Sequence, residues 1–257
     1  MKKTLTLTLM GAALGLASTA FAHTRLEFPV IQEGTRSDNN IVVTHGCTDL
    51  PVIGTVNVFP DVALARVQTS TDNFVDNIVD DARLATDFMS GGSITGLVSR
   101  EVFSLSELIK DPQGNAVGFW NGAGTIPASG WAAKSPVRIG AINIEPTSCA
   151  TKVVVVPAIA NICQLGSLAD VTGPTGRFEE SNLFVDLWTA PDAGSPFDGP
   201  AWNFPATLTV ERDLENNPLP ASCGEGFAVR VFPSAEQLDR DFKAVYQGRE
   251  FWPNSGI

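Results

Sequence analysis

Short runs of apolar and β-branched residues, separated by turn residues, make up most of the sequence after residue 22. The first run, TRLEFPVI, alternates apolar and polar positions at its start, and the later runs are rich in Val, Ile, Phe and Thr. Gly, Pro, Asn and Asp fill the gaps, which is the pattern of β-strands joined by turns. This pattern predicts strands at residues 24–31, 40–46, 54–60, 135–144, 151–159, 183–189, 206–213 and 226–232.

Two segments have a helical pattern instead. One is SREVFSLSELIK at residues 99–110, and the other is PSAEQLDRDFKAVYQG at residues 233–248. The second segment begins with a capping serine and ends with a glycine, and apolar residues recur on one face between them, namely Leu238, Phe242 and Val245. The Pro- and Gly-rich loop at 190–205 is expected to be irregular. Many short strands with one C-terminal helix predict an all-β fold, a sandwich or a partly closed barrel.

The first 22 residues are typical of a signal peptide. The N-terminal segment MKK is positively charged, and it is followed by the apolar run TLTLTLMGAALGLA. The last three residues, Ala20-Phe21-Ala22, have the small-x-small form of a signal-peptidase cleavage site. The apolar run is shorter than the roughly 20 residues that span a bilayer, although an uncleaved anchor remains the alternative. We expect cleavage after Ala22, export to the periplasm or cell surface of a bacterium, and a single domain at residues 23–257.

The cysteines and the charge fit an exported protein. Cys47, Cys149, Cys163 and Cys223 form an even set, which in an oxidising compartment predicts two disulfides with three possible pairings. A thiolate metal site would need closer spacing, such as C-x-x-C. Removal of the signal peptide, with its two lysines, takes the formal net charge from −11 to −13. This charge disfavours nucleic acid and anionic membranes and favours a cation, although an acidic surface also simply promotes solubility.

Cleavage after Ala22 makes His23 the first residue of the mature chain. Its free α-amine has a pKa near 8, and its imidazole can close a chelate ring with that amine. Two nitrogen donors suit Cu(II), which heads the divalent affinity series. Because the chain has only two histidines, one at this position indicates a metal site. A single extra residue before His23 would remove the amine from chelating distance.

Further ligands have several candidates. His45, in THGCTD, is brought back towards His23 if residues 24–31 and 40–46 pair as an antiparallel hairpin. The alternative is a turn histidine beside a structural cysteine. Glu27 shares a strand face with His23 by the period of two, and Glu33 is a weaker carboxylate candidate. Met89 is the only methionine after the signal peptide, so a thioether site for Cu(I) is excluded and Cu(II) is favoured.

Several motifs resemble the YcnI-like periplasmic copper-binding family. They are AHTRLEFP, VVTHGCTD and TVNVFPD over residues 22–60, and FWNGAGTIPASGW and VVVVPAIANICQ over residues 116–164. The resemblance implies an immunoglobulin-like β-sandwich that binds Cu(II) through His23 and a carboxylate, with a tryptophan beside the metal. That tryptophan would be Trp120, or second Trp131. It also implies the disulfides Cys47–Cys163 and Cys149–Cys223.

Tryptophans also serve as core or loop anchors, which is the alternative for both residues.

The sequence therefore predicts an exported Cu(II)-binding protein for copper trafficking, storage or homeostasis, working with another copper-trafficking protein as its partner and not as an enzyme. One alternative is a metal-free surface or adhesin-like module. Another is a copper-dependent oxidative polysaccharide-cleaving enzyme, which needs a second histidine and an axial Tyr or Phe, whereas the only tyrosine is Tyr246. No G-x-S-x-G nucleophile motif or phosphate-binding loop is present. The acidic stretch 71–81 could attract Ca²⁺ or form a solvated face.

Overall fold

The computed structural model describes residues 24–44, 50–164, 184–189 and 206–252. The predicted ligands His23 and His45, the cysteine Cys47 and the loop 190–205 lie outside these ranges. Strands dominate the described residues, and the only α-helix among them is the short α1, Ala235–Asp241. Two 3₁₀ turns, η1 Ala85–Asp87 and η3 Ala221–Cys223, complete the helical elements.

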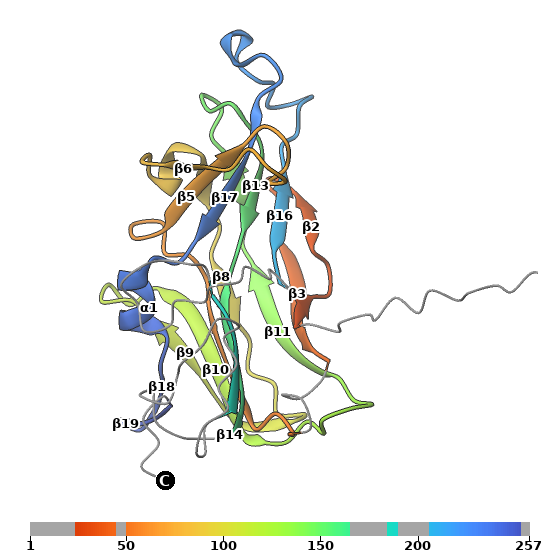
Figure 1. Ribbon diagram of the computed structural model, residues 1–257, viewed down its shortest axis with the longest axis vertical. Helices are drawn as coiled ribbons and strands as arrows, with labels where there is room; N and C mark the ends of the chain where they lie inside the picture. The colour runs from red at the N-terminus through yellow and green to blue at the C-terminus, as the bar shows by residue number, and fades with distance from the viewer. Residues whose placement is uncertain (1–23, 45–49, 165–183, 190–205, 253–257) are drawn as a thin grey trace, which may run out of the picture.

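Two antiparallel sheets face each other in the lower half of Figure 1. The four-stranded sheet has the order β1-β3-β11-β8 and the five-stranded sheet the order β15-β14-β4-β10-β9. The strands of the first are β1 Arg25–Leu26, β3 Ser37–Val43, β11 Ala133–Ile139 and β8 Ile94–Gly96. Those of the second are β15 Phe184–Trp188, β14 Ala158–Gln164, β4 Gly54–Val58, β10 Ala116–Gly124 and β9 Phe103–Lys110.

Buried polar side chains join these two sheets across the interior. Asn161 on β14 donates to the hydroxyl of Thr24 at 2.7 Å, and Asn121 on β10 donates to the hydroxyl of Ser135 on β11 at 3.0 Å. All four side chains are buried. These cross-sheet bonds establish a β-sandwich, which confirms the predicted all-β fold class.

A six-stranded sheet forms the upper half of the molecule in Figure 1, with the order β2-β16-β13-β17-β5-β6. Its strands are β2 Val30–Gln32, β16 Leu208–Glu211, β13 Ala150–Val155, β17 Phe227–Phe232, β5 Arg66–Ser70 and β6 Val79–Asp81. A small pair, β7 Met89–Gly91 and β12 Ile142–Ile144, lies beside it. One apolar core includes Ile41 and Val137 of the sandwich together with Val153 and Val229 of this sheet, so both halves are packed around the same core.

The C-terminal segment covers the outer face of the five-stranded sheet. Ser234 caps α1 by accepting a hydrogen bond from the backbone N–H of Gln237 at 3.2 Å. The hairpin of β18 Ala244–Tyr246 and β19 Arg249–Trp252 follows. Phe242 and Trp252 pack edge to face at 5.3 Å between ring centroids, and both belong to the apolar cluster that contains Trp120 and Val56.

Both helix predictions need correction. Residues 99–110 contain strand β9, not a helix, because Phe103–Lys110 pairs along its length with β10. The C-terminal helix is real but ends at Asp241, where Phe242 leaves the helical conformation. The β18–β19 turn has Gln247 and Gly248 at φ +50° and +76°, as tight hairpin turns require. Gly248 thus serves a hairpin, and Val245 is 38% exposed.

The predicted strand 24–31 is split between two sheets. Arg25 and Leu26 pair with Val42 and Ile41, so the expected hairpin partner is confirmed. The chain then crosses over, and β2 pairs in parallel with β16 of the upper sheet. At the crossing, the Asn39 side chain accepts from the Phe28 N–H at 3.0 Å and donates to the Phe28 C=O at 2.7 Å. The side chain thereby replaces the strand partner that the backbone loses.

Candidate functional site

One end of the four-stranded sheet gathers the described neighbours of the predicted ligands. Arg25 lies opposite Val42, and Val43 lies opposite Ala133, so Thr24 follows at the level of this second pair. Thr24, Val43 and Ala133 therefore lie together at this end, which we call the β1–β3–β11 end. His23 precedes the first of these residues, and His45 follows the second.

The β1–β3–β11 end is firmly anchored. Thr24 is 2% exposed, and its hydroxyl is bonded to Asn161 of the opposite sheet. Val43 and Ala133 are buried in a cluster with Cys163. The residue directly after His23 is therefore fixed by a cross-sheet hydrogen bond, directly before the paired strand β1.

Glu27 is held on the outer face of the sheet, the side away from the five-stranded sheet. Its carboxylate accepts from the Lys134 ammonium and from the Asn40 side chain, the latter at 2.6 Å. The hydrogen bond from Lys134, followed by that from Asn40, lowers the pKa of Glu27 below its usual range. A metal would have to compete with Lys134 for this carboxylate, so the predicted role of Glu27 as a ligand stays a prediction.

The two candidate tryptophans have different surroundings. Trp120 is 1% exposed and packs edge to face against Tyr246, with 6.1 Å between ring centroids. Its neighbour Asn121 bonds towards the four-stranded sheet, so Trp120 points to the opposite face, under the C-terminal segment. Trp131 is 67% exposed and lies two residues before Ala133, at the β1–β3–β11 end. Trp120 is therefore packed in an apolar cluster and Trp131 is exposed, and the predicted place of either residue beside a metal stays a prediction.

The disulfide between Cys149 and Cys223 is present, as predicted, with 5.3 Å between the Cα atoms. Arg212 donates to the carbonyl oxygens of Ser148 and Ala150 on either side of Cys149, at 2.9 and 3.0 Å. Cys163 is buried and disulfide-bonded. Because Cys47 lies outside the described residues, the Cys47–Cys163 pairing stays a prediction.

The other acidic candidates serve as internal anchors. The carboxylate of Glu33 accepts from the backbone N–H groups of Ile144 and Asp213 and from Asn217. In the acidic stretch 71–81, the carboxylate of Asp72 accepts from the hydroxyl of Ser70 and from three backbone N–H groups of its own loop, those of residues 75–77. These bonds, first that from Ser70, lower the pKa of Asp72 to about 2. Among the described residues, no three His, Cys, Asp or Glu side chains are grouped as metal ligands would be.

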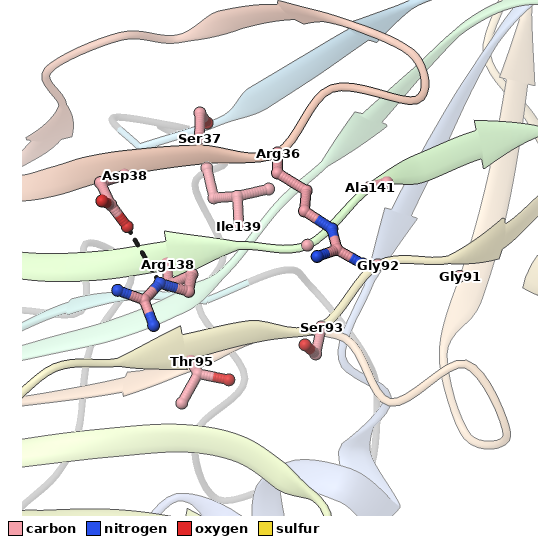
Figure 2. A pocket seen from close by; sticks show the side chains of 11 residues that line it. Arg36, Ser37, Asp38, Gly91, Gly92, Ser93, Thr95, Arg138, Ile139 and Ala141 are labelled. Atoms are coloured by element: carbon pink, nitrogen blue, oxygen red, sulfur yellow. Dashed lines mark hydrogen bonds and ion pairs between the residues drawn. The ribbon is translucent and has the colours of Figure 1, made fainter.

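A groove of about 730 Å³ lies at the opposite end of the four-stranded sheet, where β3 begins and β11 ends. Its lining includes two arginines, Arg36 and Arg138, with the hydroxyls of Ser93 and Thr95 (Figure 2). No motif in the sequence points to this groove. Its residues come from three segments far apart in the chain, and only the strand register brings them together.

No helix in the described ranges has the length and apolar character needed to cross a membrane. Comparisons with known proteins found no matching family model and no matching curated protein. A solved structure of an uncharacterized protein from Nocardia farcinica, described as having an immunoglobulin-like fold, is similar with a TM-score of 0.33 and 12% identity. The match covers 74% of this chain and 98% of that one.

Proposed function

We propose that the chain is an exported Cu(II)-binding protein that holds the metal through the α-amine and imidazole of His23 and serves copper trafficking, storage or homeostasis. The observation that carries the proposal is the register of β1, β3 and β11. It brings the residues adjoining His23 and His45, and with them Trp131, to one end of one sheet.

The rigidity of that end supports a terminal chelate. Thr24 is fixed by Asn161, so a metal bound to the preceding residue would be held against a sheet end and not on a free tail. The two nitrogens of His23 are the core of the proposed site, and His45 is its further candidate ligand.

Charge and compartment agree with this proposal. A formal net charge of −11 favours accumulation of a cation near the protein. The Cys149–Cys223 disulfide is compatible with the oxidising compartment to which a signal peptide would direct the chain. Trp131, largely exposed at the same end, can shield a bound cupric ion from one side.

The test is electron paramagnetic resonance of the mature protein loaded with one equivalent of Cu(II). The parent is compared with His23→Ala and with a form that retains Ala22, which keeps the imidazole but moves the amine. We expect a nitrogen-coordinated spectrum in the parent and its loss in both altered forms, while the disulfide and thermal unfolding remain unchanged. Identical spectra in the parent and His23→Ala would overturn the proposal. A parent that retains no copper after dialysis would favour the metal-free surface module.

A further inference from the structure

The outer face of the four-stranded sheet has a row of polar side chains that runs across three adjacent strands, β3, β11 and β8. Asp38 on β3 lies opposite Arg138 on β11, and Arg138 lies opposite Thr95 on β8. The neighbouring inward positions are apolar and buried, as shown by Ile139 and Ile94. The polar row therefore faces solvent across the whole width of the three strands.

The next row of outward-facing residues lines the groove. Arg36, Gly140 and Ser93 continue the same three segments by two residues, and all three line the groove. Gly140 has no side chain, which leaves a gap between the arginine on one side and the hydroxyl on the other. Figure 2 shows Arg36 reaching over the chain towards Gly92 and Ser93, while Arg138 points towards Thr95.

Both guanidinium groups retain hydrogen-bonding capacity. Arg138 donates through Nε to the carboxylate of Asp38 at 3.1 Å, and this pair is highly exposed, so it is weak. Within the part of the chain that the structure describes, its two Nη groups have no acceptor, and Arg36 has no acceptor at all. With Asp38 as the one acidic side chain of the groove lining, the local charge is positive in a protein whose net charge is −11.

The geometry points to an oxyanion-binding site in this groove, for the phosphate or carboxylate group of a small hydroxylated molecule. Arginine presents planar pairs of N–H donors that match the oxygens of either group. The hydroxyls of Ser93 and Thr95 supply neutral donors and acceptors for the remainder of the ligand. Acidic residues elsewhere on the protein are screened beyond about 8 Å at physiological ionic strength, so they do not cancel this local field.

This site is separate from the proposed copper site. The groove lies where β3 begins, and the β1–β3–β11 end lies where β3 finishes, after seven residues of extended chain. At about 3.3 Å per residue, the two ends are roughly 20 Å apart. Oxyanion binding and copper binding can therefore fail independently.

The test is isothermal titration calorimetry on the mature, metal-free protein with three probes: inorganic phosphate, D-glucuronate and neutral D-glucose. We expect at least one of the two anions to bind, with an affinity that falls as salt is added, and glucose to give no heat. Arg36→Ala should weaken binding by about tenfold, as expected for loss of a charge-assisted hydrogen bond. Arg100→Ala removes the same charge from the exposed segment after β8, outside the groove lining, and should leave the affinity unchanged.

Amide chemical shifts of Ser93, Thr95 and Gly140 should move on addition of the anion that binds. The anion that gives heat identifies the source of the ligand as a phosphate or a carboxylate. Absence of heat with both anions would overturn the inference, as would equal affinities in the parent and Arg36→Ala. Equal binding of glucose and glucuronate would also overturn it, because recognition would then not depend on charge.

Discussion

Asn161 donates a hydrogen bond to the hydroxyl of Thr24 at 2.7 Å, across the interior of the sandwich. Both side chains are buried. The bond links the interior strand β14 of one sheet to the residue just before the edge strand β1 of the other, which is also the residue that directly follows His23. It is therefore the contact on which the position of the proposed metal site depends most directly.

Replacement of Thr24 by Val should destabilise the protein by about 1–3 kcal/mol, because the buried Asn161 amide loses an acceptor while the side-chain volume is kept. Urea unfolding of the variant and the parent measures this loss. Thr24→Ser is the matched control, since it keeps the hydroxyl, and it should retain most of the hydrogen-bond contribution. Equal stability of the Val and Ser variants would show that the cross-sheet bond contributes little.

Copper binding should quench tryptophan fluorescence mainly through Trp131. This indole is exposed at the β1–β3–β11 end, whereas Trp120 is shielded by the five-stranded sheet and the C-terminal segment. Titration of Cu(II) should therefore quench the parent strongly and Trp131→Phe much less, with the copper affinity itself little changed. Undiminished quenching in Trp131→Phe would place the metal elsewhere.

Asp72 should give the protein a pH-dependent contribution to stability. Its folded-state pKa of about 2 lies below the ordinary value of 3.8, because the carboxylate accepts from Ser70 and from backbone N–H groups. A depressed pKa means that the contribution is fully present above pH 4 and is lost as the pH falls towards 2. The free energy of unfolding should therefore decline more steeply over this range in the parent than in Asp72→Asn.

Asp76→Asn is the control for that measurement, since it removes a carboxylate from the same loop, where only the backbone N–H of Asp76 bonds to Asp72. This variant should keep the parent's steep decline. Parallel pH profiles for the parent and Asp72→Asn would contradict the proposed role of the carboxylate. Direct titration of Asp72 by NMR gives an independent value for its pKa.

Replacement of both Cys149 and Cys223 by Ser should lower the free energy of unfolding by about 2–5 kcal/mol. The disulfide closes a loop with a sequence separation of 74, which restricts the unfolded chain. Urea unfolding under non-reducing conditions measures the effect. Arg212 should keep the local fold intact by holding the carbonyl groups on both sides of residue 149, so the far-ultraviolet circular dichroism should be unchanged. A stability equal to that of the parent would contradict this prediction.

Alternation of apolar and polar residues was sufficient to predict most strands and the sandwich, because each face of a sheet has its own environment. It failed at residues 99–110, where side chains compatible with a helix form β9 because β10 offers a partner along its whole length. The residue pattern within a segment does not show whether a more distant segment of the chain will pair with it. The same limit applies to Pro29, after which the chain enters another sheet instead of continuing β1.

The candidate sites were likewise only partly predictable from the sequence. The hairpin between the segments next to His23 and His45 followed from their spacing, and the register of β1 and β3 agrees with it. The environments of Trp120 and Trp131 did not follow, since both lie in one Gly-rich stretch. Only the structure shows that Trp120 lies on β10 under the C-terminal segment, whereas Trp131 lies after β10 and is exposed. The groove between Arg36 and Arg138 had no local signature at all, because neither arginine is part of a basic cluster in the sequence.

The burial of Trp252 at the end of the described chain has a consequence for biogenesis. Its indole is 0% exposed and completes the cluster around Phe242 and Trp120. A chain that lacks β19 leaves this side of the five-stranded sheet uncovered, so the apolar cluster is complete only once residues 249–252 have been made. The outer face of a sheet whose strand β4 is made early in synthesis is therefore closed by one of the last described strands.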